Sequence, residues 1–266
     1  MFDLLLPALL VLGFLGIVLN TVVGGGGGAV LVPALILIFN QSTNSSIAAS
    51  FVAVTVGALV STLAYTRQGR VDYRIGLPLT ALALPGTILG ALITSSLQGP
   101  SFELVLGMVI LLVALLPLTR KPLTTVEPKG GWSRKFTDSF GTKFAYDVKM
   151  RLAMPTAVAS GFLAGIFGAG GALVLTPGLV MAGYPIHIAI GTVRLIAIGI
   201  SFSGSLTRFY LGQVEINMAL WLSVGAVCGA IAGARLVRLL DGELLKKMVS
   251  VAISLLGLAL ILRSVL

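Results

Sequence analysis

Five consecutive glycines, Gly24 to Gly28, interrupt an apolar stretch that runs from Leu4 to Phe39. As one straight helix this stretch would be about 54 Å long, whereas the hydrocarbon core of a bilayer is about 30 Å thick. Glycine also costs about 1 kcal/mol per residue relative to alanine inside a helix. The stretch is therefore predicted to break at the glycines. It forms either a long tilted helix with a break or a hairpin of two half-helices that returns to its own side.

The rest of the chain has the composition of a helical membrane protein. It is 57% hydrophobic and only 10% charged, which is far more apolar than a soluble domain requires. Further apolar stretches have lengths near the roughly 20 residues that cross a bilayer. They cover residues 46–66, 75–97, 102–118, 188–207, 216–234 and 247–262. We therefore expect an all-α polytopic membrane protein in the cell membrane.

The basic residues indicate topology and not nucleic-acid binding. The formal net charge is +9, but eight of the 18 Lys and Arg residues lie between Arg120 and Arg151, and most others are at helix ends. Positive charge gathered in one loop is typical of the segments that orient a membrane protein. A groove that follows nucleic-acid phosphates would need a continuous basic surface. We expect the lipid bilayer as a partner and no nucleic acid.

The features of the first half recur in the same order in the second half. Three pairs of segments match: 24–33 with 168–177, 67–72 with 210–215, and 86–91 with 229–234. Ordered matches at a nearly constant offset indicate an internal duplication. We predict an N-terminal membrane repeat (1–118), a cytoplasmic linker loop (119–150) and a C-terminal membrane repeat (151–266).

The positions of Lys and Arg favour hairpins over long broken helices. If the stretches 4–39 and 152–184 are hairpins, each followed by three spans, the basic segments 67–74, 119–151 and 235–247 all lie inside, as the positive-inside rule requires. With eight simple spans, the last of these segments lies outside. The hairpin arrangement gives each half an odd number of crossings. We therefore predict an inverted repeat, in which each half is a glycine-broken helical hairpin plus three transmembrane helices.

Two prolines predict where the second limb of each hairpin begins. Pro33 and Pro177 follow the glycine runs, and proline is tolerated in the first turn of a helix. Half-helices are expected to begin at about residues 28–32 and 172–176. Their N-termini would offer free N–H groups and the positive end of a helix dipole to an anion near mid-membrane.

Close helix packing by small residues is the alternative use of these glycines. We expect packing for Gly86, Gly90, Gly229 and Gly233, whose spacing suits close helix crossings. For the two longer runs we favour a binding site, because five glycines exceed what packing needs.

Arg194 suggests the charge of the ligand. It lies nine residues past Pro185, roughly 12–14 Å along the helix. An arginine at such depth is costly and is usually paired or functional. All the acidic residues fall at loop or helix-end positions, so an anionic ligand would supply the missing charge. Alternatively, Arg194 bonds to carbonyls at a broken helix, or the helix begins later.

Neutral polar residues complete the predicted site. Asn20 and Thr21 precede the first glycine run, and Ser50 aligns with Gly191 of the second half. The predicted substrate-binding residues are Asn20, Thr21, Gly24, Gly25, Gly26, Gly27, Gly28, Ser50, Gly168, Gly170, Gly171, Gly191, Thr192 and Arg194. No catalytic residue, metal ligand or cofactor is predicted, because no Ser/His, paired-carboxylate or metal-ligand set occurs at membrane depth.

The order of these motifs resembles the TauE/SafE family of membrane permeases, often called sulfite exporters. The resemblance rests on the segments 24–33, 161–177, 189–192 and 229–235, and it extends over nearly all of the chain outside the central loop. One departure is Ala48-Ala49-Ser50-Phe51, where the second half has a Gly-Thr pair. The resemblance implies transport of small sulfur-containing anions such as sulfite or organosulfonates, usually outward.

We therefore expect an anion permease and not an enzyme. The substrate would lie between the hairpin tips, near Arg194, and movement of one half against the other would expose it alternately. A channel-like anion pathway and a non-transporting membrane scaffold are the alternatives. The expected partner is a small inorganic or organic sulfur anion, and a homodimer is left open.

Overall fold

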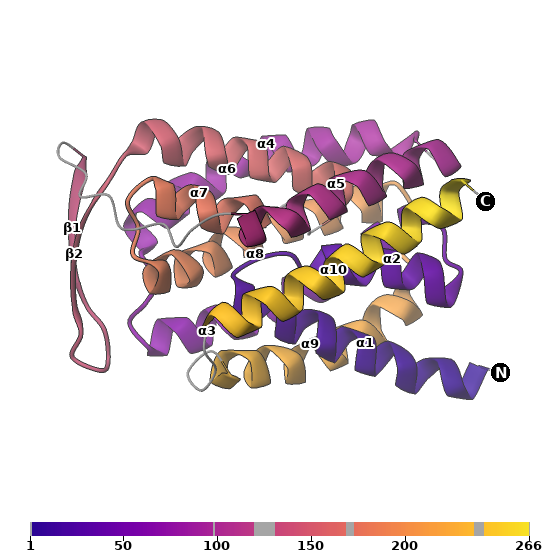
Figure 1. The fold of residues 1–266 in the computed structure, drawn as a ribbon, viewed down its shortest axis with the longest axis horizontal. Coiled ribbons are helices and arrows are strands. Elements are labelled where there is room, and N and C mark those ends of the chain that lie inside the picture. The colour runs from indigo at the N-terminus through magenta and orange to yellow at the C-terminus, as the bar shows by residue number, and fades with distance from the viewer. Residues whose placement is uncertain (1, 98, 120–130, 169–172, 237–241, 266) are drawn as a thin grey trace.

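The computed structural model describes residues 2–97, 99–119, 131–168, 173–236 and 242–265, and these form ten helices and one pair of strands (Figure 1). The first repeat contains α1 (Phe2–Val23), α2 (Gly27–Phe39), α3 (Thr43–Arg67), α4 (Tyr73–Ser95) and α5 (Pro100–Thr119). The strands are β1 (Trp132–Thr137) and β2 (Lys143–Val148). The second repeat contains α6 (Met150–Phe167), α7 (Leu175–Met181), α8 (Ile186–Tyr210), α9 (Ile216–Leu236) and α10 (Gly242–Val265).

The all-α polytopic membrane fold predicted from the sequence is confirmed. Five of the described helices, α3, α4, α6, α8 and α9, are long and apolar enough to cross a membrane by length and composition. The six predicted spans correspond to α3, α4, α5, α8, α9 and α10, with similar bounds. The chain is a multi-pass membrane protein.

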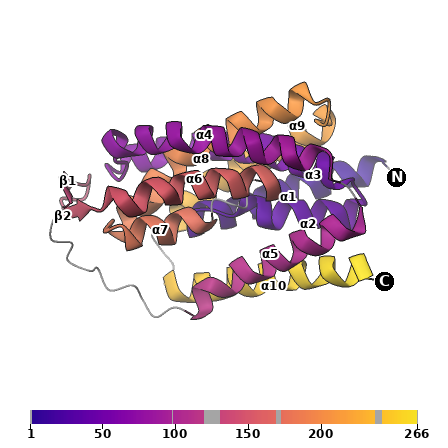
Figure 2. The ribbon, with the colours of Figure 1, turned by 90° about the horizontal axis from the view of Figure 1, so that it is seen from above.

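Each glycine-rich stretch turns back on itself. Between α1 and α2, Gly24, Gly25 and Gly26 have φ values of 81°, 158° and 98°, which only glycine adopts without strain. After this turn α2 runs back toward the end of the molecule where α1 begins (Figures 1 and 2). In the second half the Lys149 N–H donates to the Ala182 carbonyl at 2.8 Å, so the chain entering α6 meets the chain leaving α7. Both stretches are hairpins and not long broken helices.

The second limbs begin close to the predicted positions, but the role given to Pro33 is wrong. The limb α2 begins at Gly27, so Pro33 lies in its second turn. The helix starts early because Asn20 accepts the Gly27 N–H with its side-chain oxygen, which fixes the first turn upstream of the proline. Pro177 is the third residue of α7 and lies in its first turn, as predicted.

The packing role of the isolated glycines is confirmed. A Cβ on Gly86 or Gly90 of α4 would meet backbone atoms of α6, and a Cβ on Gly229 or Gly233 of α9 would meet backbone atoms of α1. No side chain fits at such a crossing, because the facing carbonyl oxygens lie inside van der Waals contact of a methyl group.

The helix contacts of one repeat have counterparts in the other. Helix α1 packs against α9 as α6 packs against α4, and α3 packs against α9 as α8 packs against α4. The contacts α3–α8 and α5–α10 join equivalent helices of the two repeats. The duplicated sequence thus forms duplicated contacts, while the inverted relation of the halves stays a prediction.

A β-hairpin lies at one end of the molecule, away from both chain termini (Figures 1 and 2). Strands β1 and β2 pair antiparallel, with Trp132 opposite Val148 and Thr137 opposite Lys143. The Asp138 carboxylate accepts the N–H groups of Phe140 and Thr142 and so shapes the turn. The segment 119–150 was predicted as a loop. Its described part instead contains this small sheet, in which both strands carry aromatic residues and Phe136 pairs with Phe144.

Candidate functional site

The tips of the two hairpins meet inside the protein. The Thr176 hydroxyl in α7 donates to the Gly24 carbonyl at 2.6 Å, a buried contact between residues 152 positions apart. A Cβ on Gly26 would overlap the Leu173 side chain. The first glycine run and the start of α7 are therefore in direct contact, as the predicted site requires.

Each tip also packs against the opposite repeat. A Cβ built on Gly24 would lie 3.1 Å from Ile190 of α8, and one built on Gly168 would lie 3.4 Å from Ile47 of α3. Gly168 has a φ of 82°, in the region that favours glycine. The described part of each tip thus packs against the long helix of the opposite repeat. Gly170 and Gly171 lie outside the described residues.

Asn20 holds the first tip in shape. Its side-chain oxygen accepts the Gly27 N–H at 3.0 Å, and its backbone carbonyl accepts the Gly25 N–H at 3.1 Å. The N-terminus of α2 was expected to offer free N–H groups to an anion, but the Asn20 oxygen already occupies the first of them. Asn20 still has an unused hydrogen-bond donor, because its Nδ2 is buried and has no partner among the described residues.

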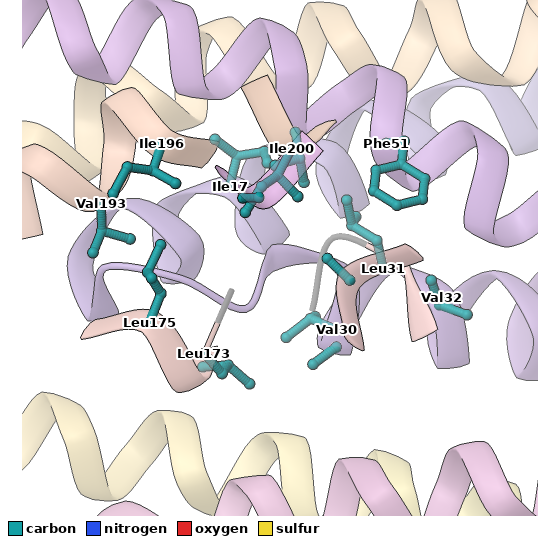
Figure 3. Close-up of a cluster of buried hydrophobic side chains, with 14 of the residues drawn as sticks. Ile17, Val30, Leu31, Val32, Phe51, Leu173, Leu175, Val193, Ile196 and Ile200 are labelled. Atoms are coloured by element: carbon teal, nitrogen blue, oxygen red, sulfur yellow. The ribbon is translucent and has the colours of Figure 1, made fainter. Parts of the chain in front are cut away.

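The surroundings of the tips are apolar. Figure 3 shows Leu31 of α2, Leu173 and, on α8, Val193 and Ile196 as members of one cluster of apolar side chains, and all of them are buried. Polar atoms are scarce here, and an unpaired polar atom in such surroundings is costly. The few polar groups that remain unpaired near the tips are therefore the atoms to consider as ligand contacts.

Arg194 is the largest of these unpaired groups. Its side chain is fully buried at 0% exposure, and Nε, Nη1 and Nη2 all lack a hydrogen-bond partner among the described residues. No carboxylate of the described chain forms an ion pair with it; the ion pairs found there join Arg70 to Asp138 and Arg134 to Asp72. The alternative that Arg194 bonds to carbonyls is not what the structure shows.

Tyr65 connects the first turns of α8 to the first hairpin. Its hydroxyl donates to the Thr21 carbonyl at 3.3 Å, and its Cβ lies 3.5 Å from the position of a Cβ on Gly191. The end of α1, the end of α3 and the first turns of α8 therefore converge at Tyr65.

Two buried hydroxyls add to the unpaired donors of this region. Thr21 Oγ1 and Thr62 Oγ1 have no partner among the described residues. Thr62 is one turn before Tyr65 on α3, and Arg194 is one turn after Gly191 on the antiparallel α8, so both lie at a similar level. We use the name donor cluster for the unpaired donors on the three helices that converge at Tyr65: Asn20, Thr21, Thr62 and Arg194. Its members can all donate hydrogen bonds, and Arg194 carries a full positive charge.

Three further predicted site residues, Gly191, Thr192 and Ser50, make contacts with other parts of the protein. A Cβ on Gly191 would overlap the Arg70 carbonyl, and the Thr192 hydroxyl accepts the Asp72 N–H at 3.1 Å. The Ser50 hydroxyl donates to the Ile47 carbonyl at 2.8 Å and faces the second tip near Gly168. A substrate contact of these three residues stays a prediction. Thr62 and Tyr65 were missed, because only the pairing of α3 with α8 brings them to the level of Gly191 and Arg194.

A second polar network was not predicted and lies at the β-hairpin end. The fully buried Asp72 accepts from Arg134 at 2.8 and 3.0 Å and from the Tyr146 hydroxyl at 3.0 Å, and it caps α4 through the Ile75 N–H. The hydrogen bond from Arg134 to Asp72 raises the pKa of Arg134 above its ordinary value, against the lowering effect of burial. Burial, with the nearby Asp72 charge, raises the pKa of Tyr146. Arg134 therefore stays charged and the Tyr146 hydroxyl stays protonated at neutral pH.

This network joins the two repeats. Asp72 lies at the start of α4, its N–H reaches Thr192 of α8, and the Tyr146 ring contacts the Tyr184 ring beyond α7 at 5.2 Å between centroids. Arg70 pairs with Asp138 at 3.0 Å and lies over the Phe140 ring. The β-hairpin thus cross-links the α3–α4 and α7–α8 connections at this end of the molecule.

A pair of contacting re-entrant hairpins inside a bundle of membrane-spanning helices is the architecture of a membrane transporter. No group of three or more His, Cys, Asp or Glu residues that could hold a metal ion occurs in the part of the chain described. The sequence matches the family described as Sulfite exporter TauE/SafE over residues 9–260. The chain belongs to this family, as its motifs suggested.

Similar proteins are named as membrane transporters. The probable membrane transporter protein YunE of Bacillus subtilis (strain 168) is 29% identical over 262 residues, which cover 95% of this chain and 96% of YunE. The probable membrane transporter protein YdhB of the same organism is 26% identical, with 95% of this chain and 98% of YdhB covered. A probable membrane transporter protein of Methanocaldococcus jannaschii is 23% identical, with 98% and 97% covered. No solved structure matches the chain.

Proposed function

We propose that this protein exports small sulfur-containing anions, such as sulfite or an organosulfonate, across the cell membrane by alternating access. The observation that supports the proposal most is Arg194, a fully buried arginine whose three nitrogens have no partner in the described chain. A bare buried guanidinium is costly, and a bound anion removes that cost.

The donor cluster has the chemistry of an oxyanion site. A guanidinium offers a planar fork of N–H groups that binds two oxygens of one ligand at once. Asn20 Nδ2 and the hydroxyls of Thr21 and Thr62 are further donors without partners in the described chain. Sulfite and sulfonate groups each carry three oxygens that accept hydrogen bonds, so one ligand can satisfy several of these donors.

Transport requires that the site open to each side in turn. Arg194 is not exposed in this conformation, so an anion bound there is enclosed by protein. The contact between Thr176 and Gly24 joins the two hairpins, and the network around Asp72 joins the two repeats at the β-hairpin end. We propose that opening toward one side breaks one of these connections while the other holds. The outward direction rests on the family description and on no residue of this chain.

Flux measurements on the purified protein in liposomes test this function. We expect saturable uptake of radiolabelled sulfite, or of a small sulfonate such as taurine, and faster uptake when unlabelled anion is present on the opposite side. Such counterflow requires a carrier that alternates between sides. Anion flux without saturation or counterflow would indicate a channel. Absence of any sulfur-anion flux by a folded protein would refute the proposal.

A further inference from the structure

A second arginine of α8 is also buried without a carboxylate. Arg208 is 0% exposed, and it forms no ion pair among the described residues. Its partners are neutral: Nη1 donates to Asn44 Oδ1 at 3.3 Å and to Gln213 Oε1 at 2.8 Å, and Nη2 donates to the Gly165 carbonyl at 3.3 Å. Its Nε has no partner in the described part of the chain. Two of these three contacts are long for charged donors.

Arg208 and Arg194 lie on one face of α8. They are 14 positions apart in the sequence, which is close to four helical turns and about 21 Å. Ser201 lies midway between them on the same face, and its side chain is buried. This face packs on α3, where Gly204 meets Phe51 and the Ser205 and Thr55 hydroxyls are 3.4 Å apart. Small and hydroxyl-bearing residues therefore occupy the interval between the two cations.

Each arginine is placed beside one hairpin. Arg194 is one turn from Ile190, which contacts the first tip at Gly24. Arg208 bonds to Gly165, which is three residues before Gly168 at the end of α6. Arg208 also bonds to Asn44, which is at the start of α3. The other end of α3 meets the β-hairpin, where the Ser139 N–H donates to the Gln68 carbonyl. Arg208 thus lies toward the opposite end of the molecule from the β-hairpin.

The repeated fold does not require either arginine. Ile47 and Ile190 make equivalent contacts with the two tips. When the repeats are aligned by the sequence separation of these two residues, Arg194 corresponds to Phe51 and Arg208 corresponds to Tyr65. The first repeat therefore forms the equivalent helix, α3, without a cation at either position. An arginine in the last turn of a helix is favoured by the helix dipole, but that effect does not require full burial.

We propose, on the basis of the function inferred above, that Arg208 is a second binding station for the transported anion. The anion occupies Arg194 when the site is loaded from the β-hairpin end and Arg208 when it is loaded from, or released to, the other end. An incoming oxyanion takes the Nε donor and replaces the neutral acceptors of Asn44 and Gly165. The face of α8 between the two arginines is then part of the transport path.

Loading measured separately from each side of the membrane tests the second station. The probe is radiolabelled sulfite, and the protein is inserted into liposomes in one orientation. An impermeant thiol reagent reads the orientation by labelling Lys143→Cys or Tyr210→Cys in a Cys228→Ala background. Arg208→Gln keeps hydrogen-bonding capacity but loses the charge. We expect it to raise KM from the Arg208 side about tenfold or more, the loss expected for charge-assisted hydrogen bonds, and to leave KM from the β-hairpin side unchanged.

Two further variants separate this role from a structural one. Arg208→Lys keeps the charge, and we expect a smaller rise of KM on the same side only; it also serves if Arg208→Gln does not fold. Gln213→Ala removes an acceptor from Arg208, and we expect KM from that side to stay the same or fall.

If the Arg208 variants lower thermal stability while both KM values stay at the wild-type level, the arginine is a helix cap and the second station is refuted. If the wild-type protein carries no sulfite, the proposed function fails first.

Discussion

The arginines at the β-hairpin end and those of α8 have opposite surroundings. Arg70 and Arg134 are partly exposed, and each is paired at about 3 Å with a buried carboxylate, Asp138 and Asp72 respectively. Arg194 and Arg208 are fully buried, and neither is paired with a carboxylate of the described chain. Among the described residues, carboxylates therefore pair with the partly exposed arginines, whose charge costs less to hold, and not with the fully buried ones.

This difference separates structural arginines from candidate functional ones. The paired arginines fasten the β-hairpin to the helix connections, and removing them should affect stability. The arginines of α8 form no such connection to a carboxylate, and their charge is available to a ligand. Variants of the two kinds should therefore fail in different ways.

The largest effect is expected from Arg194→Gln. Loss of the guanidinium charge should reduce sulfite transport in liposomes by about 100-fold or more, because a buried ionic contact is lost. Thermal unfolding should be unchanged or improved, since an uncompensated buried charge is removed. Arg134→Gln is the matched control and should lower stability while the substrate KM stays the same. Wild-type flux in Arg194→Gln would end the argument for an anion site at this residue.

The next largest effect is expected at the first hairpin tip. In Gly26→Val the new side chain would overlap Leu173 and would be held at a φ of 98°, a conformation that costs on the order of 1–3 kcal/mol for a residue other than glycine. Displacing the tip beside the donor cluster should weaken sulfite binding about tenfold. Gly212→Val is the control, because Gly212 has a φ of 68° with no atom within 4 Å of its Cβ position. Equal affinity in both variants would assign the tip glycines to packing alone.

Asp72→Asn tests the other side of the comparison. The carboxylate accepts hydrogen bonds from Arg134, Tyr146 and Ile75, and the amide keeps the helix cap but leaves Arg134 without its counter-charge. We expect the free energy of unfolding to fall by roughly 3 kcal/mol, measured by thermal or denaturant unfolding in detergent. Anion affinity should be preserved. A loss of affinity at unchanged stability would mean that the β-hairpin network belongs to the binding site.

Much of the fold could be predicted because lipid imposes strong rules on sequence. Long apolar stretches predicted the spanning helices, and the glycine run predicted the turn at Gly24 to Gly26. The β-hairpin was missed because Trp132–Thr137 and Lys143–Val148 are short and lie within a highly charged segment. A signal was present in the aromatic residues that flank the turn near Gly141.

The site was predicted less completely than the fold. Arg194 stood out because the sequence placed no acidic residue near it. The partners of Asn20, and the positions of Thr62 and Tyr65, depend on which helices pack together, and no local pattern encodes that. Arg208 lies in the last turn of α8, where an arginine is ordinary. Only its full burial in the folded chain indicates another role.

The smallest effect is expected from titration of Asp138. Burial alone raises the pKa of this carboxyl, but hydrogen bonds from Thr142, Arg70 and Phe140 outweigh burial and hold the pKa below its ordinary value of 3.8. A depressed pKa stabilises the folded state above that ordinary value, and the stabilisation is lost as the pH falls through the folded-state pKa. The melting temperature of the wild type should therefore exceed that of Asp138→Asn by a constant amount near neutral pH, and the difference should shrink only below pH 3.8. In Arg70→Gln the difference at neutral pH should be smaller and its loss should be complete at a higher pH, because one of the groups that lower the folded-state pKa is gone. A difference that already shrinks between about pH 5 and 7 would show that the carboxyl is not held in this way.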